Sequence, residues 1–183
     1  MMEAALYGTV WASVALFVAG EAGKRRVRQR RAEPAWAWPL WAAGALLCVV
    51  HSAVTFAARY GWSHEAAVRA TAAQTNSMFG LEWGGGIYVN YVFMAAWIGE
   101  AIWWRVDPSG YFARPAAVTA FFRVFYAVVL VNAAVIFAAP SRRVPGVLLM
   151  LALILIWFAS LRSAFSRQPS GEAPAGEVRT GRR

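Results

Sequence analysis

Five long stretches without a formal charge decide what this chain can fold into. Each runs for about sixteen residues or more, and together they are roughly Ala4 to Gly20, Ala35 to Ala58, Trp83 to Gly99, Val124 to Ala139 and Val144 to Leu161. A bilayer core about 30 Å thick needs about twenty mostly apolar residues of helix. A soluble domain of 183 residues has too small a core to bury five such segments. The sequence therefore predicts a multi-pass membrane protein.

Composition and charge agree with this class and argue against a nucleic-acid partner. Hydrophobic residues make up 60% of the chain and charged residues only 15%, against about 45–50% and about 25% in soluble domains. The formal net charge is +9, but the basic residues gather at the ends of the apolar stretches, where they meet lipid headgroups. The expected partners are the lipid bilayer and another membrane protein, with no nucleic acid. Cys48 is the only cysteine, so neither an intrachain disulfide nor a cysteine-based metal cluster is expected.

The predicted fold is all-α: a five-helix bundle embedded in the membrane, formed by residues 1–165. The expected spans are about 4–20, 35–58, 84–104, 116–139 and 145–163. The short segment from Pro140 to Pro145 predicts a tight turn, which makes the last two spans an antiparallel hairpin. Residues 166–183 are rich in proline, glycine, serine and charge, which predicts a disordered cytoplasmic tail.

The long connection between the second and third spans predicts a short amphipathic helix on the extracytoplasmic loop. Ser63 is a suitable N-cap, the residues after it are good helix formers, and Gly80 is suited to end the helix. The run from Gly84 to Gly86 then permits a flexible joint or the close approach of another backbone.

The charges around the first stretch predict the orientation in the membrane. Glu3 precedes the stretch and six basic residues follow it between Lys24 and Arg31, which is the reverse of a cleavable signal peptide. A retained first helix with its N-terminus outside places fourteen of the 18 Lys and Arg residues on the cytoplasmic side, together with the C-terminus. The alanine- and arginine-rich composition, with one lysine, favours a bacterial cytoplasmic (inner) membrane.

Two ionisable residues fall within the predicted spans at similar depth. Glu100 lies near the inner end of the third span and Arg123 near the inner end of the fourth. Because an ionisable group is costly in lipid, an intramembrane ion pair between them is one interpretation. The alternatives are that each side chain snorkels separately to the headgroups, or that residues 109–122 form an interfacial segment and leave Arg123 at the surface.

A second set of polar residues is expected near the outer boundary of the spans. His51, Asn90 and Asn132 come from three different spans, and Tyr91 lies beside Asn90. Such a layer either forms a small pocket that opens outward to a headgroup, quinone or ion, or simply joins helices through hydrogen bonds.

Motifs for catalysis, cofactors and metals are weak. The chain has no GxSxG, HExxH or P-loop pattern, and its two histidines, His51 and His64, do not match the paired axial ligands of a membrane haem. No cofactor and no metal is therefore predicted, and whether the protein is an enzyme stays open. The predicted function is a non-enzymatic accessory or interaction subunit. The alternative is a protein that binds a small molecule or lipid headgroup at the extracytoplasmic face, as an enzyme or a transporter.

Overall fold

The chain is helical throughout the part that the computed structural model describes, which comprises residues 2–30, 34–138 and 140–165. No strand occurs within those residues. The elements in chain order are α1 (Met2–Arg30), α2 (Ala37–Tyr60), α3 (His64–Phe79), α4 (Gly86–Val106), α5 (Pro108–Ala113), α6 (Ala116–Val131), the π-helix η1 (Asn132–Ile136) and α7 (Pro140–Phe165).

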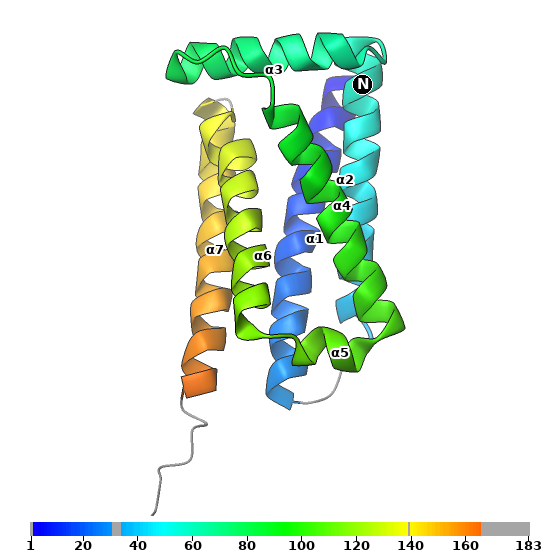
Figure 1. Ribbon diagram of the computed structural model, residues 1–183, viewed down its shortest axis with the longest axis vertical. Helices are drawn as coiled ribbons and strands as arrows, with labels where there is room; N and C mark the ends of the chain where they lie inside the picture. Colours follow the sequence, from blue (N-terminus) through cyan, green and yellow to red (C-terminus); the bar gives the residue numbers. More distant parts are fainter. Residues whose placement is uncertain (1, 31–33, 139, 166–183) are drawn as a thin grey trace, which may run out of the picture.

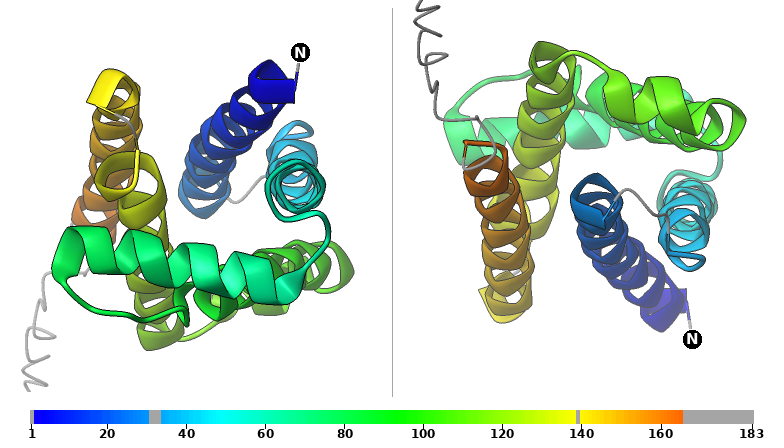
Figure 2. Two further views of the ribbon diagram at one scale, coloured as in Figure 1. Left: turned by 90° about the horizontal axis from the view of Figure 1, so that it is seen from above. Right: turned by 90° about the horizontal axis from the view of Figure 1, so that it is seen from below.

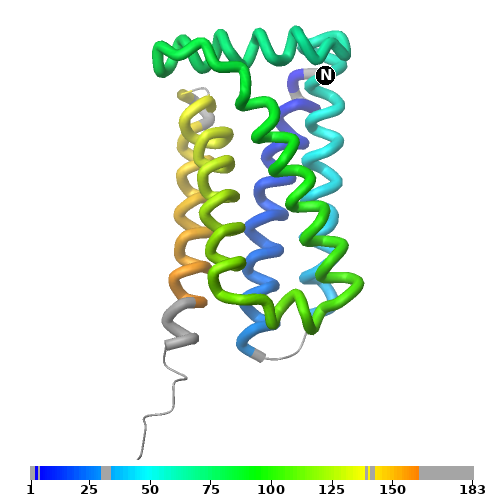
Figure 3. Tube along the Cα trace, in the orientation of Figure 1, coloured from blue at the N-terminus to red at the C-terminus, as the bar shows by residue number. Residues whose placement is uncertain are grey.

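The long helices run side by side, and two shorter helices lie at their ends. Helices α1, α2, α4, α6 and α7 form the bundle, with η1 continuing α6 (Figure 1). Helix α3 lies across one end, and α5 joins α4 to α6 at the opposite end (Figures 1 and 3). Views along the bundle show the α6–α7 hairpin on one side and the α1–α2 pair on the other (Figure 2). The core lies between the long helices, with α3 at one end and α5 at the other.

Four of these helices are long and apolar enough to cross a membrane. The apolar segments are Ala5–Gln29, Ala37–Tyr60, Ala116–Ile136 and Arg143–Ser160. Helix α4 runs beside them over 21 residues and carries Asn90, Glu100 and Arg105 among its apolar residues. The described part of the chain is therefore an all-helical protein with four candidate membrane-spanning helices.

Two boundaries differ from the sequence prediction. Helix α1 continues to Arg30, so the basic segment expected to be a loop after residue 20 is helical as far as that residue. Helix α7 begins at Pro140, so the segment expected to be a tight turn forms the first turns of that helix, with Pro145 inside it. Pro140 suits the first position of the helix because the first backbone N–H groups have no helical partner. The predicted tail, residues 166–183, lies outside the described residues.

A short helix, α3, follows α2 at the position where the sequence predicts a helix between the second and third spans. The Ser63 side chain accepts a hydrogen bond from the Ala66 backbone N–H at 3.2 Å, which is the geometry of an N-cap. Gly80 ends the helix in the left-handed region with φ 69°, where a residue with a β-carbon would be strained.

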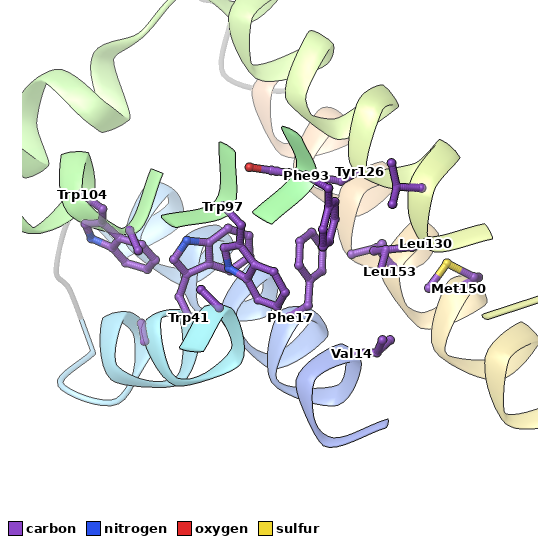
Figure 4. Close-up of a cluster of buried hydrophobic side chains, with 14 of the residues drawn as sticks. Val14, Phe17, Trp41, Phe93, Trp97, Trp104, Tyr126, Leu130, Met150 and Leu153 are labelled. Atoms are coloured by element: carbon purple, nitrogen blue, oxygen red, sulfur yellow. The ribbon is translucent and has the colours of Figure 1, made fainter. Parts of the chain in front are cut away.

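The core is a cluster of aromatic rings between α1, α2, α4 and α6 (Figure 4). The ring of Phe17 lies 4.8 Å from that of Trp41 and 4.9 Å from that of Trp97, measured between centroids. Gly44 on α2 lets Trp97 approach closely, because a β-carbon there would lie 2.8 Å from Trp97 Cζ2. This packing brings α1, α2 and α4 together and sets the depth at which charged residues are buried.

Candidate functional site

Four charged side chains meet inside the bundle near the end that carries α5. They are Glu21 and Lys24 on α1, Glu100 on α4, and Arg114 just after α5, and each side chain is at most 6% exposed. We call these four residues the buried charge network. Its two carboxylates and two cations balance in formal charge. A buried charge is tolerated only when it is paired and hydrogen-bonded, and this arrangement meets that condition.

Glu100 is the centre of the network. One carboxylate oxygen, Oε1, accepts hydrogen bonds from the Arg114 guanidinium and from the Tyr111 hydroxyl. The other, Oε2, accepts one from the Tyr126 hydroxyl at 3.0 Å and lies 3.5 Å from Lys24 Nζ. Both oxygens therefore have partners, and these partners come from α1, α5 and α6 as well as from the segment after α5.

Lys24 joins the two carboxylates. Its Nζ lies 2.8 Å from Glu21 Oε1, at an i,i+3 spacing on one face of α1, and 3.1 Å from the centroid of the Trp41 ring. The other oxygen of Glu21, Oε2, accepts a hydrogen bond from Trp157 Nε1 at 2.7 Å. Through Trp157 the network also connects to α7.

Helix α5 returns the chain to the network after α4 ends. Asp107 caps it by accepting hydrogen bonds from the Gly110 backbone N–H and the Ser109 hydroxyl, both at 2.8 Å, and these bonds lower the pKa of Asp107. Burial raises the pKa of Tyr111 to about 12, so its phenol is neutral at pH 7 and donates to Glu100. The Arg114 guanidinium lies over the Tyr111 ring, 4.4 Å from its centroid.

The structure gives Glu100 other partners than the expected Arg123. Among the described residues, Glu100 forms ion pairs with Lys24 and Arg114 only. Arg123 instead lies over the Trp157 ring, 5.7 Å from its centroid. The reason is that α6 turns Tyr126 toward Glu100, while the cationic positions beside Glu100 are taken by the α1 lysine and the arginine that follows α5.

The outer polar residues do not form one hydrogen-bonded layer. His51 Nδ1 lies 3.1 Å from the Thr9 hydroxyl and 3.0 Å from the Leu6 carbonyl oxygen, both on α1. Asn132 donates to the Val128 carbonyl oxygen of its own helix, and Asn90 is exposed.

Tyr91 belongs to a different contact. Its hydroxyl lies 3.1 Å from His64 Nδ1, and the hydroxyl of Tyr88 lies 3.1 Å from His64 Nε2. The residues proposed for an outer pocket therefore divide into separate local contacts. Within the described residues, no group of three or more His, Cys, Asp and Glu side chains is arranged to hold a metal ion.

A groove opens beside the buried charge network, between α1, the end of α5, α6 and α7. Its volume is about 510 Å³. Four arginines line it, and its lining includes no acidic residue and no histidine. The lining residues are Arg25, Arg28, Gln29, Phe112, Arg114, Ala116, Thr119, Ala120, Arg123, Val124, Ile154, Trp157, Phe158 and Ser160. We call this feature the basic groove.

The basic groove and the network share a wall. A small cavity of about 10 Å³ touches all four network residues and also Arg28 and Arg123, which line the groove. This volume is about the minimum that one water molecule needs. The Arg114 Nε group donates to the Thr119 hydroxyl at 3.1 Å, so one guanidinium links the network to a groove residue.

Sequence reasoning missed most residues of this site. Lys24 and Arg114 enter the sequence prediction only as basic residues near the ends of the spans, and Glu21, Tyr111 and Tyr126 are not part of it. One signal was present in the sequence: Glu21 and Lys24 have the i,i+3 spacing of a helical ion pair, directly after an apolar stretch. The contribution of Tyr126 and Arg114 depends on how α5 folds back, which no spacing in the sequence reveals.

Comparison with known proteins adds no relative: the chain matches no protein-family model, no curated protein and no solved structure.

Proposed function

We propose that the protein is a five-span membrane protein whose basic groove binds an anionic amphiphile. The fifth span is α4, which extends from the level of α3 to that of α5 beside the four apolar helices (Figure 1). Its Glu100 is paired inside the bundle rather than exposed to lipid, which removes the main cost of placing this helix in a membrane. The positive-inside bias supports a cytoplasmic position for the α5 end.

The composition of the basic groove is the observation that carries the proposal. Arginine side chains lie beside an apolar surface formed by Val124, Ile154 and Phe158, and no acidic residue lines the groove. Arginine guanidinium groups bind phosphate and carboxylate oxygens through paired hydrogen bonds. A molecule with an anionic head and a hydrocarbon chain matches both parts of this surface.

This proposal belongs to the ligand-binding class predicted from the sequence, but it moves the site to the opposite end of the bundle. The expected outer residues form separate contacts, whereas the basic groove combines charge, volume and apolar surface in one place. The accessory-subunit interpretation remains a prediction, and it does not by itself require a groove of this composition.

The test is retention of lipid by the purified protein. We propose to purify the full chain in a mild detergent and to identify bound lipids by native mass spectrometry. The substitution Arg123→Gln should strongly reduce retained anionic lipid, because it removes a cation from the groove wall.

Arg105→Gln is the matched control. Arg105 lies over the Trp38 ring at 5.7 Å, the same distance as Arg123 over Trp157, but it does not line the groove. Thermal unfolding should show that both variants are folded. Equal lipid retention in the two variants would contradict the proposal.

A further inference from the structure

Formal charges around the basic groove indicate how many negative charges its ligand carries. In the buried charge network, Glu21 and Glu100 are offset by Lys24 and Arg114. Of the three other arginines that line the groove, Arg28 and Arg123 form no ion pair with a carboxylate of the described residues. Arg28 lies over the Phe112 ring and Arg123 over the Trp157 ring, and Arg123 also interacts electrostatically with Glu21 at a distance longer than that of an ion pair. The network is thus neutral, and Arg28 and Arg123 leave a formal charge of at least two on the groove wall, which Arg25 also lines.

We infer that the basic groove selects a lipid whose head is a phosphate monoester, held between Arg28 and Arg123; this inference rests on the proposed binding of an anionic amphiphile. A phosphate monoester carries a charge of about −1.5 to −2 at pH 7 and has three strong acceptor oxygens. A carboxylate or a phosphodiester carries a single charge and would leave one arginine uncompensated. The monoester therefore matches the two guanidinium groups in both charge and number of acceptors.

The open, apolar side of the groove indicates that the ligand comes from the membrane rather than from water. Val124 is 63% exposed, Ile154 43% and Phe158 61%, although all three line the groove. In a bilayer this open side faces hydrocarbon chains, because α6 and α7 are both apolar enough to span it.

The length of the groove also indicates that the ligand comes from the membrane. On α6 its lining extends from Ala116 to Val124, which corresponds to about 12 Å of helix. That length is well under the thickness of a bilayer core. The groove therefore holds the head and the first part of a chain, and the remainder of the chain lies in the lipid.

The test compares lipids that share their acyl chains and differ in the charge of the head. The full protein in detergent would be titrated with phosphatidic acid, phosphatidylglycerol and phosphatidylcholine, and binding measured by native mass spectrometry. Phosphatidic acid should bind about tenfold more tightly than phosphatidylglycerol, the factor expected for one more charge-assisted hydrogen bond. Phosphatidylcholine should bind least.

A charge-removing substitution separates head charge from head size. Arg28→Gln should reduce the affinity for phosphatidic acid to about that for phosphatidylglycerol, while Arg105→Gln should leave the tenfold preference unchanged. If Arg28→Gln retains the preference, head size rather than charge selects the ligand, and the inference is overturned.

The remaining outcomes distinguish this inference from the proposed function. Equal binding of phosphatidic acid and phosphatidylglycerol by the unsubstituted protein would overturn the charge argument and leave anionic binding intact. Equal binding of phosphatidylcholine would overturn the proposed function as well. Millimolar inorganic phosphate should not displace phosphatidic acid; full displacement would show that the site takes a free anion and would overturn the lipid assignment.

Discussion

The pair formed by Glu21 and Lys24 gives the sharpest test of the buried charge network. We expect Lys24→Met to cost about 3–5 kcal/mol of unfolding free energy, because it leaves Glu21 without its ion-pair partner and Glu100 with Arg114 only. Glu21→Gln should cost less, about 2–3 kcal/mol, since Lys24 then keeps Glu100 at 3.5 Å. The lysine substitution should lower the stability more because Lys24 is an ion-pair partner of both carboxylates.

The double substitution should cost less than the sum of the single ones. It removes a whole ion pair and leaves Glu100 paired with Arg114, so no unpaired charge remains. Replacing both members of a buried pair is often nearly neutral. A double-mutant cycle should therefore give a coupling energy of at least about 2 kcal/mol.

The measurement is reversible unfolding of the full chain in mixed micelles, followed by tryptophan fluorescence and circular dichroism. The control is the same cycle on Glu65 and Arg69 of α3, an i,i+4 pair whose side chains are 79% and 65% exposed. That pair should couple by only about 0.3–0.5 kcal/mol. If the Glu21 and Lys24 losses add to within about 0.5 kcal/mol, the two groups are not coupled and the network described above is refuted.

Three further predictions concern packing, hydrogen bonding and topology. Gly44→Ala should cost about 1–3 kcal/mol of stability, because the new β-carbon meets the Trp97 ring; thermal unfolding measures it, and an unchanged midpoint would contradict the close contact. Tyr126→Phe should cost about 1–3 kcal/mol by removing a donor from buried Glu100, and a loss no larger than that of Tyr60→Phe, at a half-buried site, would contradict a strong bond. Reporter fusions in the segment joining α1 to α2 and in α3 should report opposite sides of the membrane, and the same side for both would refute the five-span topology.

The all-helical class and the long apolar helices were predictable from the sequence because their signals are local. Uncharged stretches of sufficient length predict helices one by one, and the helix α3 was recognisable from its cap residues Ser63 and Gly80. Boundaries were less predictable. The charge of Lys24 and the residues after it predicts a loop, but Lys24 pairs with Glu21 and Glu100 inside the bundle and α1 continues to Arg30.

The candidate site was less predictable because it depends on contacts between distant parts of the chain. The similar depth of Glu100 and Arg123 predicts a pair, but depth does not determine which helix face turns inward. Arg114 approaches Glu100 only because α5 reverses the chain after Asp107. The sequence alone does not determine that reversal.

The arrangement separates the groups that hold the bundle together from those that face the groove. Lys24 is buried against the Trp41 ring and two carboxylates, so its loss should lower stability while the selectivity of the folded protein for anionic lipid persists. Arg123 lies at the groove wall against an aromatic ring, and Arg123→Gln should alter lipid selectivity with a smaller effect on stability. Measuring stability and lipid selectivity on both Lys24→Met and Arg123→Gln tests this separation. If the groove existed only to support the fold, the loss of selectivity would be proportional to the loss of stability in both variants.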